Sequence, residues 1–180
     1  MNKNTITTVF SEKEKVNIGY IVAGYPSVDF TKSFLSNLDR TAIDILEIGI
    51  PYSDPLADGK LISQASFAAS QAGVTTDTVF DMLASVKGTV HKPLVFLVYY
   101  NLVFAYGIDA FLQKCVEVGI SGLIIPDLPY EEAQELVEKL RARHIAFIPL
   151  VSVTSDKRIA PIASLGDGFV YAVGSLGLSL

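Results

Sequence analysis

The chain has 180 residues, half of them apolar, and a formal net charge of −5 at pH 7. This size favours a single domain over residues 1–180 with a sizeable core. The acidic balance argues against a nucleic-acid surface, which needs clustered Lys and Arg. No apolar run reaches the roughly 18 residues of a membrane span. The first 15 residues lack the apolar segment of a signal peptide, and Cys115 is the only cysteine, so we expect a cytoplasmic protein.

Strands and helices are predicted to alternate along the chain, because near-continuous apolar runs alternate with segments whose apolar residues recur at helical spacing. The predicted strands cover residues 17–23, 43–48, 93–99, 119–125, 145–151 and 168–173. The predicted helices cover about 28–38, 60–73, 77–87, 108–118, 130–142 and 154–165. We expect a short helical turn at 11–15 and a loop at 100–107. Ser27, and Thr75 or Thr76, are expected N-caps.

This alternation, repeated six times, predicts a parallel sheet with helices outside it and right-handed crossovers. The spacing between strands is similar except after the second strand. That gap contains an additional loop and an additional helix. Since active sites of parallel α/β proteins lie at the carboxyl ends of the strands, the insertion is where we expect the chemistry.

The stretch Asp44–Gly59 carries the strongest local signal for an active site. It begins as an apolar strand that one carboxylate, Glu47, interrupts, and it continues as a Pro- and Gly-rich loop with Ser53, Asp54 and Asp58. Burying a carboxylate costs several kcal/mol unless it is neutral or paired. From the residues alone, the alternative readings are an exposed acid at a strand edge for Glu47 and an Asp-Gly turn for Asp58.

Five motifs give the chain a resemblance to a known family. They are LEIGIPYSDPLADG (Leu46–Gly59), LVYYN (Leu97–Asn101), GLIIPDLPYEE (Gly122–Glu132), GYIVAGYPS (Gly19–Ser27) and, more loosely, GDGFVYAVGSLG (Gly166–Gly177). Together they resemble the tryptophan synthase alpha subunit family over essentially the whole chain. The first motif is the most specific, because it contains the acid loop, the loop that carries Ser53, Asp54 and Asp58.

The resemblance implies a TIM (β/α)8 barrel, of which this chain holds about six βα units. It implies a lyase that cleaves indole-3-glycerol phosphate to indole and glyceraldehyde 3-phosphate in tryptophan biosynthesis. It also implies a beta subunit as partner, in an alpha2beta2 tetramer. The beta subunit is expected to carry pyridoxal phosphate, and no cofactor or metal is expected in this chain.

The resemblance also assigns roles to individual residues. Glu47 and Asp58 match the catalytic pair: Glu47 is the general acid–base, and Asp58 hydrogen-bonds the indole N–H. The expected substrate-binding residues are Tyr20, Tyr99 and Tyr171. The expected subunit-contact residues are Asp54, Pro55, Asn101 and Asp127. For Tyr171 the competing reading is core packing, and for Asp54 it is a turn before Pro55.

Some features depart from the family pattern. Lys60 replaces a proline, Phe169 replaces a tyrosine, and the loop after the sixth strand reads GLSL at 177–180 instead of GVTG. Because six parallel strands do not close an eight-stranded barrel, we expect a fragment that lacks most of the phosphate cradle. The truncated end favours the alternative of an inactive barrel fragment or scaffold that binds a beta-type partner. A second alternative is another phosphate-binding barrel enzyme, but such enzymes use a strand-end Lys as a key cation, and the six predicted strands contain none.

Cys115, His91 and His144 are expected to have no catalytic role. Cys115 lies in an amphipathic helical segment and is predicted to be a small buried apolar residue. The two histidines precede predicted strands, at the end opposite the expected site, and no metal-ligand spacing accompanies them.

Overall fold

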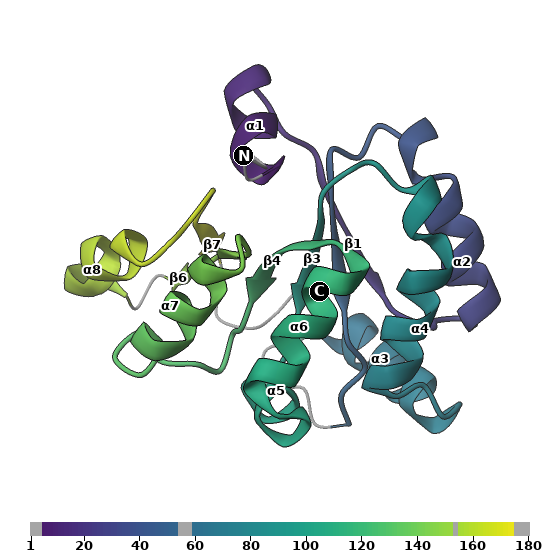
Figure 1. The fold of residues 1–180 in the computed structure, drawn as a ribbon. Helices are drawn as coiled ribbons and strands as arrows, with labels where there is room; N and C mark the ends of the chain where they lie inside the picture. Colours follow the sequence, from purple (N-terminus) through teal and green to yellow (C-terminus); the bar gives the residue numbers. More distant parts are fainter. Residues whose placement is uncertain (1–4, 54–58, 153–154, 175–180) are drawn as a thin grey trace.

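The computed structural model describes residues 5–53, 59–152 and 155–174. Its strands lie side by side as a curved layer with helices on the outside (Figure 1). The strands are β1 (Ile18–Val22), β2 (Ile45–Gly49), β3 (Leu94–Leu97), β4 (Ile120–Ile124), β5 (Ala146–Phe147), β6 (Leu150–Ser152) and β7 (Tyr171–Val173). Strands β1 to β5 form one sheet in chain order, β6 and β7 form a second, and each pairing is parallel. The predicted parallel sheet is therefore confirmed.

The segment predicted as one strand at 145–151 is divided into β5 and β6. Proline has no backbone N–H, so Pro149 interrupts the ladder. Hydrogen bonds nevertheless continue across the break: Ile148 N donates to Leu123 O (2.9 Å) and Tyr171 N donates to Pro149 O (2.9 Å). The same segment thus pairs with β4 at its start and with β7 at its end, and the six predicted strands follow one another in order.

The helices cover the outer face of this layer and one end of the inner face. They are α1 (Thr5–Glu12), α2 (Val28–Ser36), α3 (Lys60–Gln71), α4 (Thr76–Val86), α5 (Tyr100–Tyr106), α6 (Ile108–Val118), α7 (Gln134–Ala142) and α8 (Ile159–Ser164). Short 3₁₀ turns occur at Leu38–Arg40, Lys87–Thr89 and Asp156–Arg158. The predicted caps are confirmed: Ser27 Oγ accepts from Phe30 N, and Thr75 forms a capping box with Thr78.

Four helical predictions were wrong in place or extent. The helix expected at 154–165 is a 3₁₀ turn at Asp156–Arg158 followed by α8, which begins only at Ile159. The loop expected at 100–107 is helix α5, whose first N–H, that of Tyr100, donates to the Asp127 carboxylate (2.8 Å). The turn expected at 11–15 is replaced by α1, which buries Ile6 completely. Helix α7 begins at Gln134 instead of 130, because residues 130–133 form turns that follow Pro129.

The core has two layers, because successive side chains of a strand point to opposite faces. Leu46 and Ile48 belong to the larger cluster between sheet and helices, whereas Ile45 belongs to a smaller inner cluster. Ile6 of α1 closes that inner cluster near the amino ends of the strands. A Cβ at Gly122 would lie only 2.9 Å from Ile6 Cδ1, so the glycine permits the close approach. The inner face is therefore filled from the amino end.

Among the residues that the structure describes, no helix is both long and apolar enough to cross a membrane.

Candidate active site

Glu47 is the one acidic residue buried in the strands of the described structure. It lies in the middle of β2, paired with Tyr20 of β1 and Val95 of β3. Its side chain is 4% exposed. Ile45, two positions earlier on the same strand, packs in the inner cluster, so Glu47 projects toward the inside of the curved sheet as well.

Burial raises the pKa of the Glu47 carboxyl from 4.5 to about 7. Desolvation causes this shift in pKa: the charged form of the carboxyl loses its hydration when the side chain is buried. No described residue forms an ion pair with this carboxylate. A carboxyl half-protonated near neutrality can both give and accept a proton, which is what general acid–base chemistry needs.

Tyr171 lies on β7, half-buried, and packs against the inner cluster that surrounds the base of this site. Burial raises the pKa of its phenol, and the negative charge of Glu47 raises it further. The phenol of Tyr171 therefore lies within electrostatic range of the Glu47 carboxylate, although the two residues are far apart in the sequence. The structure brings these two predicted site residues together.

Tyr20 lies against the strand that carries Glu47. Its hydroxyl reaches over Gly49, and a Cβ at Gly49 would lie only 2.1 Å from that oxygen. Gly49 therefore leaves the space that the tyrosine ring occupies. The phenol of Tyr20 lies beyond Glu47, toward the carboxyl end of β2.

Tyr99 follows β3 and is buried, with 3% exposed. Its ring stacks on that of Tyr52, with centroids 4.9 Å apart and planes at 27°. Tyr52 was not among the predicted site residues. The only signal available in the sequence was an aromatic residue at the start of the acid loop.

The predicted subunit-contact residues divide into two groups. Asn101 and Asp127 are exposed and follow neighbouring strands, β3 and β4. The Asp127 carboxylate joins the loop after β4 to the start of α5 by accepting from the N–H of Tyr100. Asp54, Pro55 and the catalytic candidate Asp58 lie outside the described residues.

The residues expected to have no catalytic role lie away from Glu47. Cys115 is completely buried in α6, and burial raises its pKa. His91 and His144 are exposed and precede β3 and β5, with His91 Nδ1 2.6 Å from Asp39 Oδ2. These expectations of burial and exposure are confirmed. Within residues 5–53, 59–152 and 155–174, no three His, Cys, Asp or Glu side chains gather as a metal site would require.

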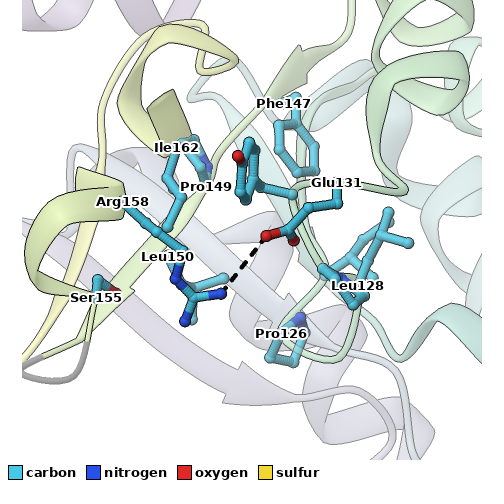
Figure 2. Close-up of a pocket in the computed structure, with 12 residues that line it drawn as sticks. Pro126, Leu128, Glu131, Phe147, Pro149, Leu150, Ser155, Arg158 and Ile162 are labelled. Atoms are coloured by element: carbon cyan, nitrogen blue, oxygen red, sulfur yellow. Dashed lines mark ion pairs between the residues drawn. The ribbon is translucent and has the colours of Figure 1, made fainter. Parts of the chain in front are cut away.

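A separate cavity of about 170 Å³ lies between the loop after β4, the β5–β6 segment and the residues around α8 (Figure 2). Phe147, Pro149 and Ile162 contribute apolar walls. Glu131 and Arg158 form an ion pair across it, with Oε1 and Nη1 3.6 Å apart. Glu47 does not line this cavity, so it is not the acid–base site.

The burial of Glu47 predicts a pH-dependent stability that Glu47→Gln removes. Because the folded state raises the pKa, it binds more protons than the unfolded state between pH 4.5 and about 7. The unmodified chain should therefore lose about 2–3 kcal/mol of unfolding free energy as the pH rises through this window. The neutral glutamine avoids this loss. Urea unfolding should show that the free energy of unfolding of the variant, relative to that of the parent, is higher at pH 8 than at pH 4.5. If the free energies of unfolding of the two chains change in parallel with pH, the burial of a titrating carboxyl is contradicted.

Comparisons with known proteins agree with the fold and with the motifs. The family described as tryptophan synthase alpha chain matches residues 6–179. The tryptophan synthase alpha chain of Campylobacter jejuni subsp. doylei is 44% identical over 168 residues, which cover 93% of this chain and 67% of that relative. The alpha chain of Alkaliphilus metalliredigens is 43% identical over 176 residues, or 98% of this chain and 66% of the relative.

Solved structures give the same result. The Campylobacter jejuni tryptophan synthase subunit alpha is 42% identical with a TM-score of 0.83, over 93% of this chain and 67% of that one. A Mycobacterium tuberculosis tryptophan synthase chain is 31% identical with a TM-score of 0.88, over 97% of this chain and 68% of that one. The predicted TIM-barrel class is confirmed. The chain spans about two thirds of the length of the curated relatives it matches. It belongs to the tryptophan synthase alpha chain family, the lyase subunits of tryptophan biosynthesis.

Proposed function

We propose that this chain cleaves indole-3-glycerol phosphate to indole and glyceraldehyde 3-phosphate, with Glu47 as the group that moves protons. The observation that carries the proposal is the carboxyl of Glu47, buried on the inner face of the sheet with a pKa of about 7. Such a group exchanges protons readily at neutral pH. Family membership supplies the reaction to which this chemistry applies.

The reaction is a retro-aldol cleavage and needs no co-reactant. A proton is added to C3 of the indole ring, and the side-chain hydroxyl next to that carbon loses a proton. The bond between C3 and the carbon that bears the hydroxyl breaks, its electron pair returns to the ring, and that carbon becomes the aldehyde. Glu47 in its acid form protonates C3, and as a carboxylate it then accepts the proton of the hydroxyl.

Asp58 and three tyrosines complete the proposed site. The carboxylate of Asp58 accepts a hydrogen bond from the ring N–H and stabilises the positive charge that C3 protonation places on the ring. Tyr20, Tyr99 and Tyr171 provide aromatic walls for the indole. The location of Tyr20 and Tyr171 close to Glu47 supports this role.

The proposed partner is a tryptophan synthase beta subunit, in an alpha2beta2 assembly in the cytoplasm. Asn101 and Asp127, together with Asp54 and Pro55, are the proposed contact residues. Asn101 is exposed in the first turn of α5 and Asp127 is exposed in the loop after β4, both just beyond the carboxyl ends of adjacent strands, which supports a shared contact surface there. Pyridoxal phosphate is assigned to the beta subunit, which would consume the indole.

The test is indole release from indole-3-glycerol phosphate, with and without a family beta subunit. We expect measurable turnover that rises when the beta subunit is added. Failure to bind indole propanol phosphate, an uncleavable analogue of the substrate, contradicts the substrate assignment. Tight binding of the beta subunit without any turnover would instead identify the chain as a scaffold.

A further inference from the structure

The side chain of Ser66 is one of the few buried polar groups in the described residues, with 4% exposed. It projects from the middle of α3 toward the strand ends. Its hydroxyl makes two hydrogen bonds to the same residue: it accepts from Tyr52 N (2.8 Å) and donates to Tyr52 O (2.9 Å). One side chain thus satisfies both backbone groups of Tyr52, 14 residues earlier.

The backbone of Tyr52 is held at the point where the acid loop begins. Ile50 N donates to Leu97 O (3.1 Å), the last link between the β2 and β3 segments before the loop. Two residues beyond this link on each side stand Tyr52 and Tyr99. Their rings stack on each other at the carboxyl ends of adjacent strands.

The Tyr52–Tyr99 stack lies on the same side of the sheet as Glu47. Val95 and Leu97 pack with the inner cluster, and Tyr99 follows them at the next alternate position. Val95 is the register partner of Glu47. The stack is therefore a wall above Glu47, on the side where an aromatic substrate would approach.

We propose that Ser66 is a positioning residue of this site, which fixes the backbone of Tyr52 so that its ring keeps its place on Tyr99. The inference rests on the proposed function for its ligand, an indole ring. Ser66 itself does not touch the ligand. It acts through Tyr52, whose ring forms the aromatic wall together with the ring of Tyr99.

Hydrogen exchange tests the anchor directly. In Ser66→Ala the Tyr52 amide loses its acceptor, so its exchange rate measured by NMR should rise about tenfold, as the loss of one buried hydrogen bond predicts. Ser70→Ala is the matched control, because it makes the same chemical change one turn later on α3, and it should leave that rate unchanged. Ser66→Thr keeps a hydroxyl and should restore the protection.

Ligand binding tests the positioning role. Ser66→Ala and Tyr52→Leu should each weaken the binding of indole roughly fivefold, as the loss of one aromatic pair predicts. Both should raise KM for indole-3-glycerol phosphate with kcat within about twofold of the parent, since neither touches Glu47. Tyr52→Leu should keep the protection of its amide, because the Ser66 anchor is intact.

The outcomes separate this inference from the proposed function. If Ser66→Ala binds indole as tightly as Ser70→Ala does, or if Tyr52→Leu has no effect on binding, the positioning role is wrong. If the parent chain binds indole but does not cleave indole-3-glycerol phosphate, the proposed function is wrong. In that case the amide exchange of Tyr52 still tests the Ser66 anchor, and the affinity for indole still tests the aromatic wall.

Discussion

Glu47→Gln should lower kcat for indole release about 10³-fold, because glutamine can neither give nor accept the proton in the cleavage step. The change keeps the size of the side chain and removes the charge that burial disfavours, so the fold should remain intact. Loss of activity in a chain of unchanged or greater stability is the combination that distinguishes a catalytic carboxyl from a structural one. Steady-state kinetics and urea unfolding on the same preparation measure both properties.

Glu138→Gln is a matched control for this experiment. It makes the same chemical change on the exposed face of α7, far along the chain from the proposed site. It should retain the parent activity. A Glu47→Gln variant with kcat within a few-fold of the parent would remove Glu47 from the mechanism.

Asp58→Asn should lower kcat about 10²-fold, the effect expected when a charged partner of the developing positive charge becomes neutral. The residue lies outside the described structure, so the expectation rests on the family motif that contains it. Asparagine still accepts a hydrogen bond through its amide oxygen. The loss should therefore appear mainly in kcat, with a smaller change in the affinity for indole propanol phosphate.

Asp81→Asn, on the exposed face of α4, is the control for Asp58→Asn. It should leave both kcat and affinity unchanged. If Asp58→Asn weakens analogue binding strongly while kcat is preserved, Asp58 holds the substrate in its ground state and does not stabilise the transition state.

Burial was the property of the site that the sequence predicted best. Glu47 lies in an apolar run typical of a strand covered on both faces, and the structure buries it between β1 and β3. The strand order followed from the βα alternation for the same reason, since local patterns and chain connectivity are enough to specify a parallel layer.

The aromatic wall could not be predicted from local patterns. The stack of Tyr52 on Tyr99 joins residues 47 positions apart, and the Ser66 anchor depends on where α3 packs. Helix α5 was not predicted, because its first N–H donates to the carboxylate of Asp127, a residue that follows a different strand. In each case the deciding contact is tertiary, and only the fold brings the partners together.

The most direct measurement of the central claim is an NMR titration of the Glu47 side-chain carboxyl in the unmodified chain. The Glu47 signal is assigned by its absence from the spectrum of Glu47→Gln. Its pKa should be about 7, because burial on the inner face disfavours the charged form. A pKa near 4.5 would contradict the claim, since a carboxyl fully ionised at neutral pH has no proton to give to the indole ring.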